Sequence, residues 1–514
     1  MQKNISVMLL YPPEQVWPQM MVKPNGSLAY PMLGGALIEN GIEVKLFDAC
    51  VGNEKDELED VFYKSSPLPS GMRRTGVSEE RILEEVADSE IVGLTSIFSH
   101  QETMVLNTAR IIKAAFPEKL LVAGGVNARH RQKVFFKNGV DLICTSEAEQ
   151  TIVEIVRTLA SGSRCFAHIP MLAYLEDGVP CQTRGAGDII WDLDELPLPA
   201  WHLLPNERYW EIGRPHGGHF EPGEELKYAS MMTSLGCPFR CAYCHIAGEL
   251  KGTMSGPIGR FRVKSDDRVL QELDILKSLG VKQIFLEDDS FFGKKQRGLK
   301  LLKKIRGSNF EILGVNGVNV IHLLKKGEPD AEVIGALAEA GFRDISLPFE
   351  SANPRIISKY ASNKWDITNS NVPALIRVLN EAGIRCDANY MIGYPDETKE
   401  EIYRTIEFAK KCMEWGLAAV GFSLVMPLPG TPLFDSATRE GYLSRDYDPD
   451  KMQWQKANMV NTVVPPEELE EIRSEAWAEL NNPKYLNYKR NMIVDVNRGE
   501  ILRSSSGGSA DEKN

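Results

Sequence analysis

The chain has 514 residues, more than a single hydrophobic core usually organises, so we expect two or three domains. With 43% hydrophobic and 25% charged residues, the composition is that of a soluble globular protein. The net charge of −12 argues against nucleic acid as a partner, because phosphate binding needs basic residues. No apolar run approaches the ~20 residues of a membrane-spanning helix, so we expect a cytoplasmic protein with no transmembrane segment.

Apolar β-branched runs alternate with helical patterns along the first part of the chain. This alternation predicts an α/β domain, a parallel sheet of Rossmann or flavodoxin type that binds ligands beyond the carboxyl ends of its strands. The predicted strands are Ile5–Tyr11, Ile42–Asp48, Ile91–Ser96, Lys119–Ala123 and Leu142–Thr145. The predicted helices are Met32–Glu39, Glu102–Ala115, Ala128–Asn138 and Glu149–Ala160. Residues 54–80 break the alternation and are expected to form an insertion or extended loop.

A hairpin is predicted at Met171–Thr183, and the Pro-rich stretch Leu193–Trp201 suits an interdomain linker. We expect residues 206–227 to be a loop that crosses between domains. A second βα series follows. Its predicted strands are Ala229–Leu235, Gln283–Glu287, Glu311–Asn316, Asp344–Phe349, Arg385–Met391 and Ala418–Met426, with helices at Asp266–Leu279, Glu332–Ala340 and Lys399–Trp415. Six βα units are fewer than the eight of a closed barrel, so we expect an open, partial barrel.

The last part of the chain is helix-rich, with Glu467–Leu480 as its clearest helix, and it ends in a polar tail that we expect to be disordered. The predicted boundaries are a Rossmann-like domain at 1–190, a linker at 191–227, a partial barrel at 228–445, a helical region at 446–502 and the tail at 503–514.

Three of the nine cysteines, Cys237, Cys241 and Cys244, lie on the loop after the first strand of the second series. Three thiolates so spaced can each bind one corner of a cubane iron–sulfur cluster, whose fourth iron stays open to a small molecule. A structural zinc site is an alternative, but it needs four ligands, and His245 is too close to Cys244 to be a comfortable fourth. Three unrelated buried cysteines are a further alternative, although a Gly-Cys-Pro turn is a poor core element.

The CxxxCxxC spacing, with an aromatic residue before the third cysteine, resembles the radical SAM superfamily. The resemblance implies a 4Fe–4S cluster on the three thiolates, with S-adenosylmethionine (SAM) chelated to the open iron. It also implies a reductant such as flavodoxin or ferredoxin as a partner. Later strand ends resemble the superfamily in the same order, although solvated loop acids remain an alternative for the two aspartates. The residues implied for SAM binding are Tyr243, Asp288, Asp289, Glu350, Ser351, Met391, Gly393 and Met426.

The upstream domain resembles the cobalamin-binding module of one radical SAM class, which includes hopanoid methylases and the anaerobic cyclase of bacteriochlorophyll synthesis. The implied cobalamin-binding residues follow the third, fourth and fifth predicted strands and are Thr95, Ser96, Gly124, Gly125, Val126, Ser146 and Glu147. A generic set of Rossmann-like turns, or a domain that has lost its ligand, remains the alternative. Many cobalamin proteins carry a cobalt-ligating histidine where this chain has Cys50, so the resemblance implies cobalamin without a histidine ligand.

The resemblance implies a cobalamin-dependent radical SAM methyltransferase that moves a methyl group to an unactivated carbon or phosphorus centre of a small-molecule substrate. One SAM methylates cobalamin, and a second yields the 5′-deoxyadenosyl radical that abstracts hydrogen from the substrate. The alternatives are a cyclase, oxidase or rearrangement enzyme without net methyl transfer, a radical SAM enzyme with an empty first domain, and a non-enzymatic iron–sulfur redox protein. The sequence identifies neither the substrate nor any catalytic residue beyond the cofactor ligands.

Overall fold

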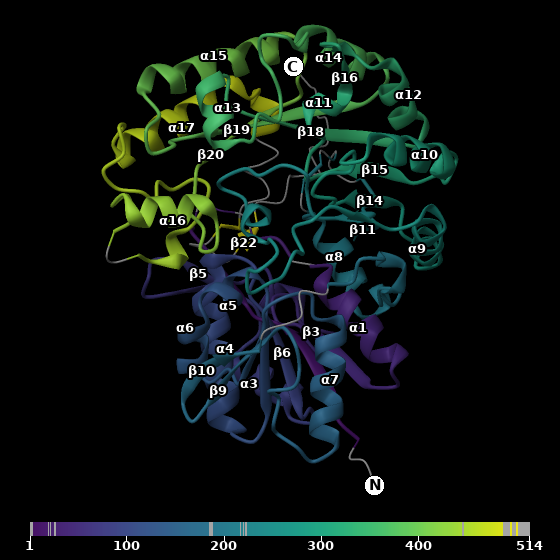
Figure 1. Cartoon of the computed structure of the whole chain (residues 1–514), viewed down its shortest axis with the longest axis vertical. Coiled ribbons are helices and arrows are strands. Elements are labelled where there is room, and N and C mark those ends of the chain that lie inside the picture. The colour runs from purple at the N-terminus through teal and green to yellow at the C-terminus, as the bar shows by residue number, and fades with distance from the viewer. Residues whose placement is uncertain are drawn as a thin grey trace, which may run out of the picture.

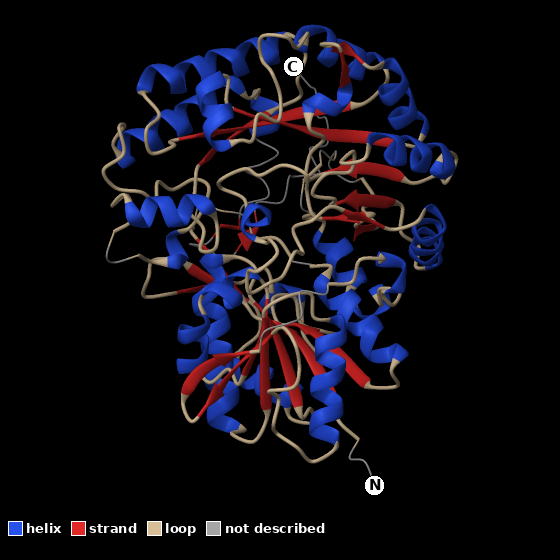
Figure 2. Ribbon diagram, viewed as in Figure 1, coloured by secondary structure: helices blue, strands red, loops and turns tan. Residues whose placement is uncertain are grey.

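A computed structural model describes residues 4–486 except 19, 21, 25–26, 184–188, 216, 219, 221–223 and 445–446, together with the short strands β21 (Val494–Asp495) and β22 (Glu500–Ile501). The molecule has two lobes stacked along its long axis, each built around its own sheet (Figures 1 and 2). The predicted α/β class is confirmed. The predicted tail at 503–514 lies outside the described residues.

The N-terminal sheet contains five parallel strands in the order β3-β1-β6-β7-β8, which is the flavodoxin-like order 2-1-3-4-5. These strands are β1 (Ser6–Tyr11), β3 (Glu43–Asp48), β6 (Ile91–Thr95), β7 (Leu120–Gly124) and β8 (Leu142–Cys144). Alternate residues of β1 enter two separate cores, Met8 and Leu10 in one and Val7 and Leu9 in the other. The sheet is therefore buried on both faces, as its continuous apolar strands require.

Helices cover both faces of this sheet. They are α1 (Ala29–Glu39), α3 (Glu79–Val86), α4 (Glu102–Ala115), α5 (Val126–His130), α6 (Gln132–Lys137) and α7 (Glu149–Ala160). The predicted helix Ala128–Asn138 is thus two short helices, which meet at Arg131.

The hairpin predicted at Met171–Thr183 is present as β9 (Leu172–Glu176) and β10 (Val179–Gln182). It also extends the sheet to seven strands, because β9 pairs antiparallel with β8. Residues 54–80, expected to be an insertion or an extended loop, are not loop throughout. This stretch contains α2 (Leu58–Val61), β4 (Ser66–Pro67) and β5 (Arg73–Thr75), and β5 pairs with β2 (Glu14–Val16).

The segment between the sheets is packed against both of them. The expectation of a loop at 206–227 is wrong for α8 (Asn206–Ile212). Tertiary contacts stabilise this short helix, since Tyr209 donates a 2.7 Å hydrogen bond to Asp48 and the Trp210 indole donates one of 2.8 Å to the Tyr228 carbonyl. Earlier in the segment, the fully buried Trp201 donates to the Ser230 carbonyl at 3.1 Å.

The second sheet has six parallel strands in the order β11-β14-β15-β18-β19-β20, an open sheet like the predicted partial barrel. They are β11 (Tyr228–Met231), β14 (Gln283–Leu286), β15 (Glu311–Gly314), β18 (Phe342–Glu350), β19 (Arg385–Ile392) and β20 (Val420–Leu424). The longer helices form the outer arc of this lobe (Figure 1). They are α9 (Asp266–Ser278), α10 (Lys295–Ile305), α12 (Ala331–Glu339), α14 (Val372–Glu381), α15 (Lys399–Glu414) and α17 (Pro466–Leu480).

Shorter elements complete the second lobe. They are α11 (Val320–Leu323), α13 (Pro354–Tyr360), α16 (Pro432–Arg439), β12 (Ser234–Leu235), β13 (Arg262–Val263), β16 (Leu324–Lys325) and β17 (Glu328–Pro329). The predicted strand Ala229–Leu235 is wrong in extent, because the sheet strand ends at Met231 and β12 pairs antiparallel with β13 instead. The chain turns there because the Asp288 carboxylate accepts hydrogen bonds from Thr233 and Ser234.

A buried ion triad fixes α9 against β13. Glu272 is fully buried and accepts from Lys264 at 2.6 Å and from Arg268 at 2.7 Å. We predict that Glu272→Gln lowers the free energy of unfolding in urea by about 3–5 kcal/mol, because two buried cations lose their counter-ion. The matched control is Glu332→Gln, since Glu332 pairs with Lys303 at the surface, and it should stay within about 0.5 kcal/mol of wild type. Equal losses in the two variants would contradict this assignment.

Candidate active site

The three clustered cysteines lie together on the loop that follows β12, at the carboxyl end of β11. Cys241 is buried, whereas Cys237 and Cys244 are partly exposed, and none of the three forms a disulfide with a described residue. Burial raises the pKa of Cys237 to about 11 and that of Cys244 to about 12, and the neighbouring thiols and Asp289 add to both shifts. The three thiols are therefore close enough to act on one another electrostatically, and binding a cationic centre would favour their thiolate forms.

This donor set fits an iron–sulfur cluster better than a single ion. Among the described residues there is no group of three or more His, Cys, Asp or Glu side chains placed to hold one metal ion. With a Zn–S bond of about 2.3 Å, three thiolates on one zinc must lie within about 4 Å of one another. In a cubane cluster each thiolate binds a different iron. The three sulfur atoms must therefore point towards one centre while staying apart from one another.

The predicted SAM residues Asp288 and Asp289 follow β14 and hold the chain that leads into Cys237. Asp288 is buried and accepts from the Thr233 backbone at 2.9 Å, from the Thr233 hydroxyl at 2.8 Å and from Ser234. Asp289 accepts from the backbone N–H of Gly236 at 2.9 Å, and burial raises its pKa to about 7. Both carboxylates thus brace the cysteine loop, and Asp289 also lies within electrostatic reach of two of its thiols.

The predicted pair Glu350 and Ser351, at the end of β18, is split by the fold. Glu350 has a left-handed backbone (φ 63°) and forms a buried ion pair with Lys364. Its charge acts on Cys241 and Tyr243, so it faces the cysteine loop. Ser351 points the other way and lies 3.2 Å from the hydroxyl of Thr405 on α15.

The turn after β19 carries the predicted residues Met391 and Gly393. The Glu397 carboxylate folds back and accepts from the N–H groups of Gly393 at 2.8 Å and Tyr394 at 3.2 Å. The left-handed φ of 83° at Gly393 allows this return of the chain. Thr398, by contrast, caps α15 through a capping box with Glu401, so neighbouring polar residues of this turn have different roles.

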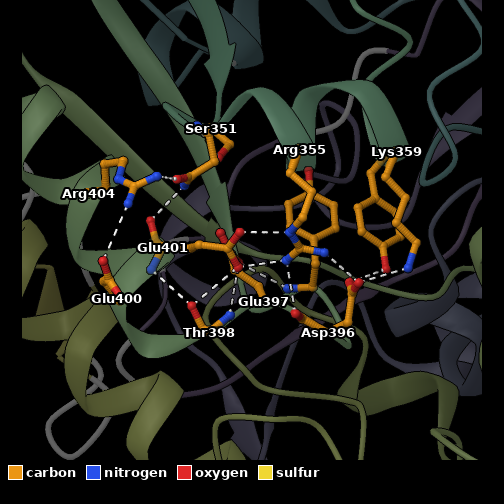
Figure 3. Close-up of polar contacts among 12 residues, drawn as sticks. Ser351, Arg355, Lys359, Asp396, Glu397, Thr398, Glu400, Glu401 and Arg404 are labelled. Carbon is orange, nitrogen blue, oxygen red and sulfur yellow. Dashed lines mark hydrogen bonds and ion pairs between the residues drawn. The ribbon is translucent and has the colours of Figure 1, made fainter.

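Ion pairs fix the outside of this turn (Figure 3). Arg355 of α13 bridges Asp396 and Glu401, each at 2.6 Å, and Lys359 binds Asp396 at 2.8 Å. These pairs are partly exposed, and Asp396 also accepts a 2.6 Å hydrogen bond from Tyr360, so they anchor the turn to α13. The other predicted residue, Met426, follows β20 and is half-buried.

Two buried polar atoms beside the cysteine loop have no hydrogen-bond partner among the described residues. They are the hydroxyl of Tyr394 and one carboxylate oxygen of Glu397, and among the same residues the Tyr243 hydroxyl has only the Cys241 thiol as a partner. Burial also raises the pKa of Glu397 to about 8. Unsatisfied buried groups are costly and rare. A ligand rich in amino, carboxylate and hydroxyl groups, such as SAM, would satisfy them, so the residues present fit that group.

In the N-terminal lobe, a small pocket opens at the carboxyl ends of β1, β3 and β6. Its lining includes Tyr11, Glu14, Asp48, Cys50, Thr95, Ser96 and Phe98. Thr95 and Ser96, predicted cobalamin residues, therefore reach the pocket. Burial raises the pKa of the Cys50 thiol well above its usual range, and Glu14 and Asp48 add to this, so Cys50 lines the pocket as a neutral thiol.

The Gly-Gly turn after β7 offers room on one side only. A Cβ on Gly124 would meet nothing within 4 Å, whereas one on Gly125 would lie 2.5 Å from the Ser96 carbonyl oxygen. Gly125 is therefore required for packing, and it starts α5 at Val126. Gly124, by contrast, faces open space at the carboxyl end of β7, the edge at which folds of this type bind ligands.

The other two predicted cobalamin residues, Ser146 and Glu147, contact the second lobe instead. The Ser146 hydroxyl donates to the Ser255 carbonyl at 2.8 Å, and Glu147 receives two hydrogen bonds from the buried Arg262, one of them 2.9 Å long. Arg129 of α5 forms an ion pair with Glu249. These contacts, which we call the latch, tie the N-terminal lobe to the segment that follows Cys244.

Sequence reasoning missed the latch partners Arg129, Glu249 and Arg262, as well as Lys364 and Tyr394. Each latch pair joins residues more than 100 positions apart, so no local pattern marks it. A second contact between the lobes is equally hidden, since a Cβ on Gly430 after β20 would lie 2.2 Å from His130 Nε2. The carboxyl ends of both sheets therefore face each other.

Comparison with known proteins agrees with this geometry. Residues 231–409 match the family model of the radical SAM superfamily. The uncharacterized methyltransferase PH0819 of Pyrococcus horikoshii is 28% identical over 84% of this chain and 88% of its own length. The cytidylyl-2-hydroxyethylphosphonate methyltransferase of Streptomyces wedmorensis is 21% identical over 85% of this chain and 82% of its own.

Among solved structures, the radical SAM methyltransferase TsrM of Kitasatospora setae, with cobalamin and a [4Fe–4S] cluster bound, superimposes with a TM-score of 0.65. It is 16% identical, and the match covers 94% of this chain and 92% of TsrM. The protein is a radical SAM enzyme, as its cysteine loop and barrel indicated. TsrM binds cobalamin and shares the two-lobe fold of this chain, in agreement with the resemblance noted in the sequence. No helix within the described ranges is long and apolar enough to cross a membrane.

The latch generates a prediction about the lobe interface. We expect Glu147→Ala to speed amide hydrogen exchange across residues 249–262 by at least about fivefold, because Arg262 would keep a buried guanidinium without its carboxylate, at a cost of about 1–3 kcal/mol. Glu154→Ala is the matched control, since Glu154 pairs with Arg157 at the exposed surface of α7. Unchanged exchange in Glu147→Ala would show that the latch does not order this segment.

Glu397 generates a prediction about pH. The folded protein keeps this proton up to a pKa of about 8, whereas an ordinary glutamic acid loses it near 4.5. The contribution of Glu397 to the free energy of unfolding is therefore fully present at low pH and is lost as pH rises towards about 8. We expect the stability of wild type relative to Glu397→Gln to fall between about pH 5 and pH 8 in urea titrations. The exposed Glu400→Gln is the control, and a pH-independent difference for Glu397→Gln would refute the protonated state.

Proposed function

We propose that the protein is a cobalamin-dependent radical SAM methyltransferase that transfers a methyl group to an unactivated carbon or phosphorus centre of a small molecule. The observation that carries the proposal is the latch between the lobes. It sets the carboxyl edge of the Rossmann-like sheet against the segment that follows the cysteine loop. Two cofactors held at these edges would share one reaction space, so a substrate between them would be accessible to both.

The proposed domains are those predicted from the sequence, namely a cobalamin domain at 1–190, a linker at 191–227, a radical SAM barrel at 228–445 and a helical region at 446–502. Cys237, Cys241 and Cys244 would hold the cluster. Around them, the proposed SAM site consists of Tyr243, Asp288, Asp289, Glu350, Ser351, Met391, Gly393 and Met426. The proposed cobalamin site consists of Thr95, Ser96, Gly124, Gly125, Val126, Ser146 and Glu147.

When bound, the cluster, SAM and cobalamin supply one-electron cleavage of SAM and a transferable methyl group. The chain's own residues position them and exclude water. Asp288 and Asp289 fix the approach to the cysteine loop, while Glu397 holds the turn at Gly393 in place. The role of Ser146 and Glu147 in this proposal is indirect, because their side chains order the lobe interface beside the ligand edge. A low-potential reductant such as a flavodoxin or ferredoxin would supply the electron.

The experiment uses full-length protein reconstituted anaerobically with iron, sulfide and hydroxocobalamin, then given SAM and dithionite. We expect 5′-deoxyadenosine by mass spectrometry and corrin absorbance that stays with the desalted protein. Cys241→Ala should abolish 5′-deoxyadenosine, whereas Cys165→Ala, at an exposed cysteine outside the site, should not. Gly124→Leu should lower corrin retention at least tenfold, because its side chain would enter the open space beside the Ser96 loop. Gly335→Leu is the control, since a Cβ there also meets nothing within 4 Å.

The outcomes separate the rival functions. Corrin loss from wild-type protein would refute the methylation mechanism even if SAM is cleaved, and would favour a radical SAM enzyme with an empty first domain. Cleavage with bound corrin, but with a substrate that gains no methyl group, would favour a cyclase, oxidase or rearrangement enzyme. A cluster without SAM cleavage in the presence of substrate would favour an iron–sulfur redox protein.

A further inference from the structure

A buried lysine, the ion-pair partner of Glu350, lies beside the cysteine loop. Lys364 follows α13, and its side chain is only 8% exposed. Its ammonium group forms an ion pair with Glu350, whose side chain is 9% exposed. Removing two charges from water is expensive, and a buried pair seldom repays that cost in stability. A functional reason for this pair is therefore worth seeking.

The segment that carries Lys364 is held firmly against the cysteine loop. The backbone N–H of Ala242 donates to the Tyr360 carbonyl at 2.7 Å, and that of Arg240 donates to the Ser362 hydroxyl at 3.0 Å. Both donors lie among the three cysteines of the motif. The next side chain along, Trp365, is buried and donates to the Phe349 carbonyl at 2.7 Å. Contacts of its segment with the cysteine loop and with strand β18 thus hold Lys364 in place.

Backbone strain marks the same place. Ser362 and Asn363 have left-handed φ angles of 58° and 49°, and Glu350, the partner of Lys364, has one of 63°. Non-glycine residues seldom adopt this conformation, and it persists only where surrounding contacts enforce it. Three such residues around one ion pair show that the fold holds this lysine in a specific position.

The charge of Lys364 reaches the cluster thiols. It opposes the effect of burial on both Cys237 and Cys241, favouring their thiolate forms, while Glu350 acts on Cys241 in the opposite sense. Asp289, which is anionic when ionised, also faces the loop and acts on Cys237 and Cys244. Lys364 and Glu350 therefore form a pair of opposite charges that both act on the sulfur atom of Cys241.

We propose that Lys364 is a positioning residue that sets the reduction potential of the cluster, with Glu350 as the counter-ion that limits its effect. The proposal rests on the function proposed above, since it requires a cluster on the three cysteines. With three thiolates, an oxidised 4Fe–4S cluster carries one net negative charge and its one-electron reduced form carries two. A fixed ammonium nearby stabilises the more negative form, so it eases electron transfer from a low-potential one-electron donor.

The test is a redox titration, followed by electron paramagnetic resonance, of the full-length protein with its reconstituted cluster and without SAM. We expect Lys364→Gln to lower the equilibrium constant for cluster reduction at least tenfold, which is about 59 mV for one electron. Glu350→Gln should raise it, because Lys364 would then be unbalanced. Lys364→Arg, which keeps the charge, should stay close to wild type.

Opposite shifts separate an electrostatic role from a structural one, since loss of packing would impair both variants in the same direction. The double variant Lys364→Gln/Glu350→Gln should return towards the wild-type potential. If Lys364→Gln fails to retain iron, the upward shift in Glu350→Gln still decides the matter. Unchanged potentials, or shifts of the same sign in both single variants, would overturn this inference and leave the proposed function standing. A wild-type chain that binds no cluster would overturn the proposed function itself.

Discussion

The site depends on one constraint, which is that a short loop with three clustered thiols must be held rigid at the end of an open sheet. A loop of this kind makes few backbone hydrogen bonds of its own, so other segments must supply them. Asp288 and Asp289 hold its entry, the Tyr360 carbonyl holds its middle, and the latch holds the segment that follows it. Three regions of the chain thus converge on one loop, and the architecture serves to bring them there.

The parallel sheets make that convergence feasible. In each lobe the carboxyl ends of the strands lie along one edge, so polar residues that follow different strands become neighbours. The flavodoxin-like strand order and the open barrel direct these edges towards each other, with the packed linker between them. The N-terminal lobe therefore does more than offer a second ligand edge. Through Arg129 and Glu147 it also orders part of the second lobe, so the two edges are mechanically coupled.

Local patterns predicted the parts of the fold that depend on local physics. Strands with continuous apolar runs, the hairpin at Met171–Thr183 and the cysteine spacing each leave a pattern within a few residues. No local pattern predicted helix α8, because its stability comes from the contacts of Tyr209 and Trp210 with distant strands. The same reason explains Asp288 and Ser146. Their strand-end positions were visible in the sequence, but the partners that occupy their side chains lie 55 and 109 residues away.

The polar groups around the cysteines lower the stability of the protein alone, but they are already placed to bind a ligand. Tyr394 and Glu397 keep buried polar atoms without partners among the described residues, and Glu350 keeps a strained backbone. Each feature costs free energy in the protein alone. A ligand that satisfies these atoms recovers that cost on binding, without first having to reorganise the surroundings. The rigid turn at Gly393 and the ion pairs outside it preserve this arrangement, because they prevent the unsatisfied groups from collapsing onto one another.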